Sequence, residues 1–192
     1  MTQLLPGDTA PWFRAPALGA NPLYAFDTAA GRHVLMLFLG AATPAQIGGA
    51  LDAVARRRAL FDDDAACFFG IVGNPDQLGD KRVAQQLPGI RFLLDYDGVV
   101  ARLYRAAEEG RPFWLLLDPT LRVVASAPVE RGGAIIEELA AILAAPQPEV
   151  TAPVLIVPRI FGPDLCRALI DYYEARAARS PASCARSTAR PC

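Results

Sequence analysis

Few residues of this chain carry side chains that could do covalent or metal chemistry. Its 192 residues include four cysteines, Cys67, Cys166, Cys184 and Cys192, and a single histidine, His33. No two cysteines have the CxxC spacing of a redox pair, and no histidine cluster accompanies them. We therefore predict no zinc site, no dithiol centre and no cofactor, and we interpret His33 as structural or exposed.

Residues 33–61 are the most informative stretch. The apolar run at residues 34–39 has no polar alternation, which favours a strand that is buried on both faces. Thr43 suits the N-cap of a following helix and Pro44 its first position. The residues that then recur at helical spacing are Ile47, Ala50, Leu51, Val54 and Ala55. This strand, turn and helix would place a helix N-terminus, which attracts anions, at the carboxyl edge of a sheet.

The turn Gly40-Ala41-Ala42-Thr43-Pro44-Ala45-Gln46 resembles the active-site turn of the peroxiredoxins. These are the alkyl hydroperoxide reductase and thiol-specific antioxidant family, whose bacterioferritin-comigratory branch reads T-P-G-C. The resemblance puts the family's threonine on Thr43, its peroxidatic cysteine on Gln46 and its leading proline on Leu39. In the family, the helix N-terminus stabilises a cysteine thiolate that attacks the peroxide. Gln46 has a neutral amide, which forms hydrogen bonds but cannot cycle through oxidation.

Three other stretches resemble the same family in the same order. Residues 7–13 match the opening G-D-x-A-P-x-F, and residues 95–104 match D-x-D-G-x-V-A-x-x-Y at every specified position. Residues 113–126 are similar to the family's F-L-I-D-x-x-G-x-I hairpin, although its usual glycine falls on Leu121 or Arg122. An arginine just before this hairpin holds the thiolate and the peroxide in the family. Arg111 is the candidate here, one residue further from the hairpin aspartate than the usual spacing.

The resemblance covers residues 5–145 and implies an α/β protein with a thioredoxin-like fold. This fold has a central mixed β-sheet flanked by helices, in three α/β/α layers. The hydrophobic patterns predict strands at residues 23–26, 34–39, 66–72, 90–94, 113–117 and 122–126. They predict helices that begin at residues 44, 74 and 99, and a closing helix at residues 134–145. We expect the second of these helices to end at Pro88, and polar turns at residues 27–32 and 95–98.

Each candidate site residue also has a structural interpretation. Thr43, Gln46 and Arg111 form either a vestigial peroxiredoxin pocket or, respectively, a helix cap, a solvent-facing amide and a surface arginine. Cys67 lies in the middle of a predicted strand, where burial disfavours the thiolate. We therefore interpret Cys67 as a core residue rather than as a substitute nucleophile.

Composition excludes several classes of partner. The chain is 53% hydrophobic and 20% charged, with a formal net charge of −1. This profile is globular, and it indicates neither a nucleic acid nor an anionic membrane as partner. The longest apolar runs fall far short of the roughly 20 residues of a membrane span. Residues 1–8 lack the basic and apolar regions of a secretory signal, so a cytoplasmic location is expected.

The last part of the chain resembles a second family. A strand is predicted at residues 153–158, and a helix that begins at Pro163 is predicted to carry its apolar residues on one face, Cys166 among them. Residues 163–173 match the P-x-L-C-x-x-L-I-x-x-Y helix of prolyl-hydroxylase-like 2-oxoglutarate/Fe(II) dioxygenases. The iron ligands of that family, an H-x-D and a distant histidine, do not follow in this sequence.

These patterns predict three segments. Residues 1–147 form the peroxiredoxin-like domain, and residues 148–175 a linker with the first strand and helix of a truncated dioxygenase-like domain. Residues 176–192 contain only small residues, prolines, cysteines and arginines. We expect this tail to be disordered, with its cysteines open to air oxidation. Our hypothesis is that the natural reading frame was lost near Ala175, which sequencing of the downstream gene would test through the presence or absence of an H-x-D.

The sequence therefore predicts a redoxin domain that has lost its peroxidatic cysteine. We expect a non-catalytic interaction or regulatory module of a longer 2-oxoglutarate/Fe(II) dioxygenase. The alternative is a thiol-dependent peroxidase, an antioxidant oxidoreductase that reduces hydroperoxides through an atypical cysteine. A third possibility assigns all chemistry to the dioxygenase half. The predicted partners are that dioxygenase segment or a second copy of the chain, with no nucleic acid and no membrane.

Overall fold

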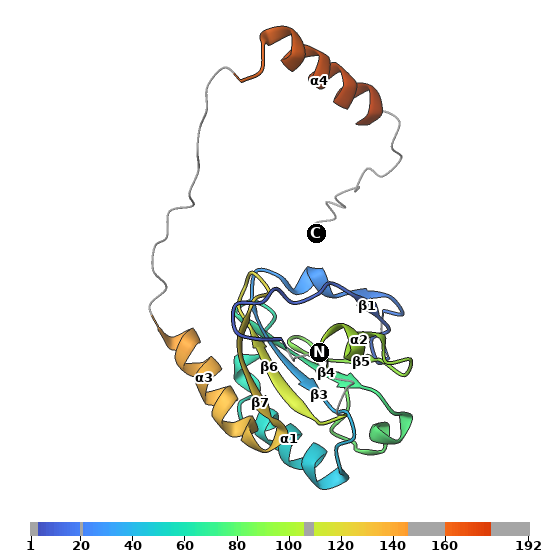
Figure 1. The fold of residues 1–192 in the computed structure, drawn as a ribbon, viewed down its shortest axis with the longest axis vertical. Helices are drawn as coiled ribbons and strands as arrows, with labels where there is room; N and C mark the ends of the chain where they lie inside the picture. The colour runs from blue at the N-terminus through green and yellow to red at the C-terminus, as the bar shows by residue number, and fades with distance from the viewer. Residues whose placement is uncertain (1–3, 20, 106–109, 146–159, 178–192) are drawn as a thin grey trace, which may run out of the picture. The chain divides into compact units, whose positions relative to one another are not determined.

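The computed structural model describes residues 4–19, 21–105, 110–145 and 160–177 (Figure 1). The chain divides into two compact units, Met1–Gln147 and Pro148–Cys192. Several predictions lie outside the described residues: the strand at residues 153–158, the linker around it, and the tail from residue 178 onward with its two cysteines.

The first unit is built on a five-stranded sheet with the spatial order β5-β4-β3-β6-β7 (Figure 1). Its strands are β3 (His33–Phe38), β4 (Ala66–Val72), β5 (Ile90–Leu94), β6 (Phe113–Leu117) and β7 (Val123–Pro128). The first three run parallel, whereas β6 is antiparallel to β3 and β7 to β6. The predicted mixed sheet is confirmed. The carboxyl ends of β3, β4 and β5 therefore meet at one edge.

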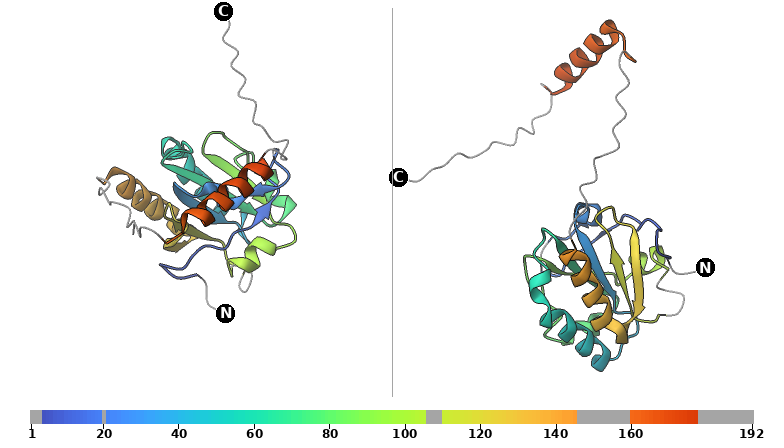
Figure 2. Two further views of the ribbon diagram at one scale, coloured as in Figure 1. Left: turned by 90° about the horizontal axis from the view of Figure 1, so that it is seen from above. Right: turned by 90° about the vertical axis from the view of Figure 1, so that its left-hand side faces the viewer.

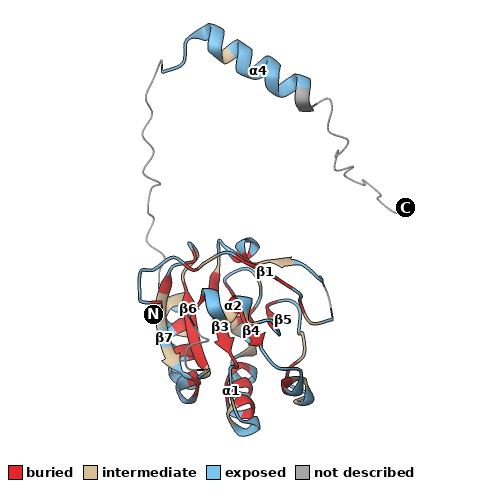
Figure 3. Ribbon diagram, turned by 45° about the vertical axis from the view of Figure 1, so that its right-hand side comes forward, coloured by how far each residue is buried: buried red, intermediate tan, exposed pale blue. Residues whose placement is uncertain are grey.

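The central strand β3 is buried along its whole length because both faces of the sheet are covered (Figure 3). Val34, Met36 and Phe38 belong to one apolar cluster, together with Val100 of the short helix α2 (Val99–Leu103). The side chains between them, such as Leu35, belong to a second cluster on the opposite face. An apolar run without alternation is what this two-sided burial requires.

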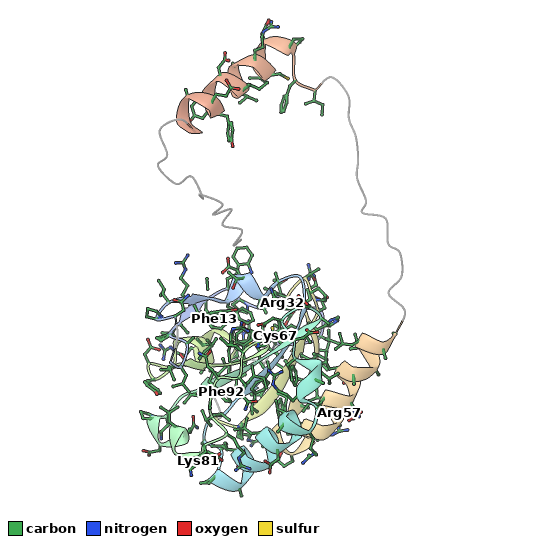
Figure 4. The ribbon with its side chains drawn as sticks, turned by 180° about the vertical axis from the view of Figure 1, so that it is seen from behind. Phe13, Arg32, Arg57, Cys67, Lys81 and Phe92 are labelled. Atoms are coloured by element: carbon green, nitrogen blue, oxygen red, sulfur yellow. The ribbon has the colours of Figure 1, made fainter. Side chains whose placement is uncertain are left out.

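The longer helices α1 (Pro44–Arg56) and α3 (Gly132–Ala144) cover one face of the sheet (Figure 2). Their side chains pack against each other as well as against the strands. A salt bridge of 2.7 Å joins Arg57, just after α1, to Glu137 of α3 (Figure 4). The helix α2 and the N-terminal segment cover the other face, which gives three layers.

The buried face of α1 differs from the predicted one at its edge. Ile47, Leu51 and Val54 are buried as expected, but Ala55 is exposed and Ala53 is buried instead. The buried stripe is rotated toward α3, because α1 packs against this helix as well as against the sheet.

The predicted long helix after β4 is wrong. Only the 3₁₀-helix η3 (Pro75–Gly79) forms, and turns follow it as far as β5. Asp80 explains the early end, since its carboxylate accepts the backbone N–H of Arg82 at 2.9 Å. It also binds the Arg82 guanidinium, at 2.7 Å. A short side chain that binds its own backbone in this way competes with a continuing helix.

The N-terminal segment is extended, as predicted. β1 (Arg14–Ala15) pairs with β2 (Tyr24–Ala25), which is shorter than the predicted strand at residues 23–26. The 3₁₀-helix η1 (Phe26–Ala29) begins at the last residue of that predicted strand and extends into the polar turn predicted at residues 27–32. Two further 3₁₀-helices, η2 (Arg58–Leu60) and η4 (Val129–Arg131), follow α1 and β7.

Residues 7–10 pair with the start of β7. The Gly7 N–H donates to the Val123 carbonyl at 2.8 Å, and the Val123 N–H donates to the Asp8 carbonyl at 2.9 Å. The Ala10 N–H donates to the carbonyl of Leu121 at 2.8 Å. Leu121 itself is buried and has a φ of +58°, a left-handed backbone conformation that glycine adopts more readily than leucine.

The described part of the second unit contains the helix α4 (Pro163–Ala177). The helix begins where predicted and ends at Ala177, two residues beyond the end of the predicted segment at residue 175. Most of its described side chains are exposed, including Leu169 and Tyr173, while Cys166 is half-buried (Figure 3). No helix among the described residues is long and apolar enough to cross a membrane.

Candidate functional site

The turn between β3 and α1 is fixed by close backbone contacts. The Ala41 N–H donates to the Gly110 carbonyl at 2.7 Å, and the Ala42 N–H donates to the Leu39 carbonyl at 2.8 Å. Gly40 has a φ of +46°, and a Cβ at this position would lie 2.4 Å from the Gly110 oxygen. Only glycine fits this approach. The turn therefore holds the loop that carries Arg111 beside the carboxyl end of β3.

Thr43 and Gln46 form a reciprocal capping box at the start of α1. The Thr43 Oγ1 accepts the backbone N–H of Gln46 at 3.3 Å, and the Gln46 Oε1 accepts the backbone N–H of Thr43 at 2.9 Å. These two bonds satisfy N–H groups that a helix leaves without partners at its N-terminus. The predicted cap at Thr43 is confirmed, and Gln46 completes it.

The amide of Gln46 is held from its other side by Glu130. The Gln46 Nε2 donates to the Glu130 Oε1 at 2.8 Å. The backbone N–H of Glu130 and this amide bond lower the pKa of the Glu130 carboxyl, so it is charged at neutral pH. A carboxylate is favoured beside the positive end of a helix. The N-terminus of α1 therefore already has a neutral amide and an anion of this chain beside it.

A pocket of about 230 Å³ opens at the carboxyl edge of the three parallel strands. Its lining comes from the ends of β3, β4 and β5, from α2, and from the loop before β6: Phe38, Gly40, Ile71, Gly73, Asn74, Asp95, Tyr96, Gly98, Ala101, Gly110 and Arg111. Arg111 is exposed at this pocket, whereas Thr43 and Gln46 do not line it. The structure thus brings Thr43 and Gln46 together and places Arg111 at a neighbouring pocket.

Gln77 is a positioning residue that the sequence did not reveal. Its buried side chain donates from Nε2 to the Gly40 carbonyl at 2.8 Å. Its Oε1 accepts the N–H groups of Gly73 at 3.1 Å and Asn74 at 3.3 Å. Gln77 thus ties the turn after β3 to the turn after β4. The spacing Asn74-x-x-Gln77, a capping-box pattern like Thr43-x-x-Gln46, was the signal that could have revealed it.

Asp95 was predicted only as a turn residue, and it is buried in the pocket wall. Its two carboxylate oxygens accept the N–H groups of Val100 at 2.8 Å and Ala101 at 2.7 Å. Burial raises the pKa of Asp95, although these two backbone bonds oppose the shift. Asp95 therefore fixes the start of α2 against the end of β5.

The two described cysteines, Cys67 and Cys166, lie in different units of the chain. Cys67 is only 1% exposed, and its Sγ lies 3.8 Å from the His33 carbonyl oxygen (Figure 4). Cys67 belongs to an apolar core cluster of the first unit, and this burial raises the pKa of its thiol to about 12. Cys166 lies on α4 in the second unit. Burial of His33 lowers its pKa, in agreement with a structural role.

Comparison with known proteins identifies the fold. No family model and no curated protein matches the sequence. Solved structures do match. One is the bacterioferritin comigratory protein of Xanthomonas campestris, studied for alkyl peroxide reduction. It is 19% identical to this chain, the match covers 68% of this chain and 92% of that one, and the TM-score is 0.53. PrxQ of Xylella fastidiosa is 14% identical, and the match covers 74% of this chain and 99% of that one with a TM-score of 0.56.

The thioredoxin domain of a thiol-disulfide oxidoreductase from Bacteroides vulgatus matches as well. It is 16% identical, and the match covers 70% of this chain and 97% of that one with a TM-score of 0.52. The chain has a thioredoxin-like fold. Within this fold, the capping box at Thr43 and Gln46 and the pocket at Arg111 are neighbouring features of the same sheet edge. Among the described residues, no group of three His, Cys, Asp or Glu side chains is arranged to hold a metal ion.

Proposed function

We propose that the first unit is a peroxiredoxin-like domain without a peroxidatic cysteine, and that it acts as a non-catalytic interaction or regulatory module. The observation that carries this proposal is the side chain of Gln46. It occupies the third position of α1, closes the capping box with Thr43 and binds Glu130. Thr43, Gln46 and Arg111 are then the remains of a peroxide site.

The chemistry of peroxide reduction supports this assignment. A thiolate must attack the peroxide oxygen and become a sulfenic acid, which a thiol then reduces. The carboxamide of Gln46 has neither the nucleophile nor the reversible oxidation. Cys67 lies mid-strand in the core, with a thiol that stays protonated at neutral pH. Glu130 would also repel a second anion at the helix N-terminus.

We further propose that the module belongs to a longer 2-oxoglutarate/Fe(II) dioxygenase, with domain boundaries near residues 147 and 175. The support is the dioxygenase-like pattern at residues 163–173, together with the helix α4 that spans it. The described residues offer no group of ligands for iron. We therefore place no iron chemistry on the thioredoxin-like domain.

A peroxide-consumption assay with a thiol reductant tests the absence of peroxidase activity. The purified chain and its Cys67→Ser variant are compared with a known peroxiredoxin under the same conditions. We expect consumption by both variants to equal the rate of buffer with reductant. Turnover by the wild type that Cys67→Ser abolishes would instead establish the alternative, a thiol peroxidase with an atypical cysteine.

A binding experiment tests the module role separately. The chain is co-expressed with a tagged polypeptide that continues the dioxygenase-like sequence, and the complex is isolated on the tag. We expect the two to co-purify in stoichiometric amounts. Dioxygenase activity that is the same with and without the thioredoxin-like domain, combined with no co-purification, would assign all function to the dioxygenase half.

A further inference from the structure

The pocket at the carboxyl edge of the sheet combines an arginine with apolar walls. We propose that it binds a small organic anion, a monocarboxylate with an apolar body, whose carboxylate lies at Arg111 and whose body lies against Phe38, Ile71 and Ala101. The proposal shares Arg111 with the remains of the peroxide site, but it needs neither the capping box of Thr43 and Gln46 nor any peroxidase activity.

The position of the pocket favours a ligand site. The helix α1, which leaves β3, and the helix α2, which leaves β5, pack on opposite faces of the sheet. A crevice opens where such connections diverge, outside the carboxyl ends of the strands, and α/β proteins bind ligands there. The pocket lies at this crevice, between the ends of β3, β4 and β5.

The polar groups at the pocket are mostly hydrogen-bond donors. Arg111 lines the pocket, and the five N–H groups of a guanidinium allow it to bind an anion while it keeps other contacts. The Asn74 Oδ1 already accepts the Asp76 N–H at 2.9 Å, so the Asn74 NH₂ group is the part that can meet a ligand. Tyr96, about half exposed, adds a hydroxyl. Three donors from three loops select a ligand with acceptor atoms.

The acidic residue in the wall does not oppose this choice. Both oxygens of Asp95 accept backbone N–H groups at the start of α2. Its carboxyl is therefore turned toward those amides, which offset its charge. The remaining walls are the apolar side chains of Phe38, Ile71 and Ala101. An apolar body against these walls and an anionic head at Arg111 would use both parts of the pocket.

The pocket is small and held in shape before any ligand arrives. Its volume of about 230 Å³ is below the roughly 300–1,000 Å³ of sites for drug-sized molecules, so the ligand is a compact one. Gln77 links Gly40 to Gly73, and Asp95 fixes α2. A preformed site of this kind loses little conformational entropy when it binds.

Titration with phenylacetate, followed by amide chemical shifts in ¹⁵N-labelled protein, tests the proposal. The neutral isostere phenylacetamide serves as the matched control ligand. We expect saturable shifts at Ile71, Gly73, Gly98 and Ala101 with phenylacetate. We also expect affinity for phenylacetamide to be lower by about tenfold, since the neutral amide cannot form the charge-assisted hydrogen bonds that a carboxylate forms with an arginine. Equal affinity for the two would overturn the choice of an anion.

Variants locate the site. Arg111→Gln should weaken phenylacetate binding by about tenfold and leave phenylacetamide binding unchanged. Gly73→Leu should abolish binding of both, because it adds a bulky side chain to a residue that lines the pocket, at a position where a Cβ would meet no atom within 4 Å. Gly49→Leu is the control, since Gly49 of α1 has the same free space but does not line the pocket.

Two results would overturn the proposal. One is shifts that saturate at residues of α1 or α3 rather than around the pocket. The other is binding that survives Gly73→Leu with unchanged affinity. The wild-type comparison of phenylacetate with phenylacetamide needs no variant, so a folding defect in Gly73→Leu would not remove the test.

Discussion

The turns after β3 and β4 use the same capping pattern with different results. In the first, Thr43 and Gln46 cap α1 at the surface, and the glutamine amide continues to Glu130. In the second, Asn74 and Gln77 cap only a 3₁₀-helix, but the glutamine is buried and reaches Gly40 in the other turn. The first box serves its own helix, whereas the second fixes the pocket between two strand ends.

This difference indicates that the local motif does not determine the role of its glutamine. Burial and the neighbouring carbonyl decide it. A buried amide that satisfies three backbone groups is costly to remove, because those groups lose their partners. A surface cap contributes mainly to its helix. The four predictions below test this comparison, from the largest expected effect to the smallest.

The glycines of the two turns should respond differently to the same change. Gly40→Ala should lower the free energy of unfolding by about 3 kcal/mol, because a Cβ would lie 2.4 Å from the Gly110 oxygen in addition to the left-handed φ. Gly73→Ala meets no atom within 4 Å and should stay within about 0.5 kcal/mol of the wild type. Urea unfolding measures both. Equal losses would contradict the tight approach of Gly110 to Gly40.

The two glutamines should differ in the same direction. Gln77→Ala removes bonds to Gly40, Gly73 and Asn74 and should cost about 2 kcal/mol. Gln46→Ala should cost less than about 1 kcal/mol, since the bonds that it removes, to Thr43 and to Glu130, are exposed. Urea unfolding of both variants gives the difference. If Gln46→Ala proved the more costly, the pocket turn would not depend on Gln77.

Asp95, which follows β5 at the carboxyl edge of the sheet, should make the stability of the protein depend on pH. Its pKa is raised in the folded state, so the folded protein holds the proton more tightly than the unfolded chain. The free energy of unfolding of the wild type should therefore exceed that of Asp95→Asn by the largest amount in acid. This difference should fall as the pH rises from about 4 through the pKa of Asp95 in the folded protein. Unfolding of both proteins at a series of pH values measures this slope. A difference that rises with pH would show that the backbone bonds outweigh burial.

A cysteine in place of Gln46 would report on the charge of Glu130 beside the capping box of α1. Gln46→Cys places a thiol at the helix N-terminus, where the dipole should lower its pKa. Glu130 opposes this, so the thiol pKa should be lower in the Gln46→Cys/Glu130→Gln protein than in Gln46→Cys alone. Alkylation rates at several pH values, with Cys166 and the two tail cysteines replaced by serine, measure the difference. Equal pKa values would mean that Glu130 no longer faces position 46.

Sequence reasoning succeeded where the determinants are local. The strand at β3 and the cap at Thr43 follow from a continuous apolar run and from residues within one helical turn. The turn at residues 95–98 and the start of α4 at Pro163 are local in the same sense. Such features do not depend on distant parts of the chain.

The contacts that the sequence did not predict join segments that are distant along the chain. The bond from Gln77 to Gly40 spans 37 residues, and the bond from Gln46 to Glu130 spans 84. No periodicity predicts these partners. The expected helix after β4 is a different case, because its early end has a local cause. The Asp80 carboxylate binds the backbone N–H and the guanidinium of Arg82, and this local pairing competes with a continuing helix. The contact of Arg82 with Asp52 of α1 adds a long-range partner.

The pairing of residues 7–10 with β7 has a consequence for handling this protein. β7 is the last strand of the sheet, and its outer side would otherwise present unpaired backbone groups at Val123. Strand edges of this kind recruit other chains into intermolecular sheets and precipitates. Removal of the first ten residues should therefore promote self-association at high concentration, even though none of those residues lines the pocket.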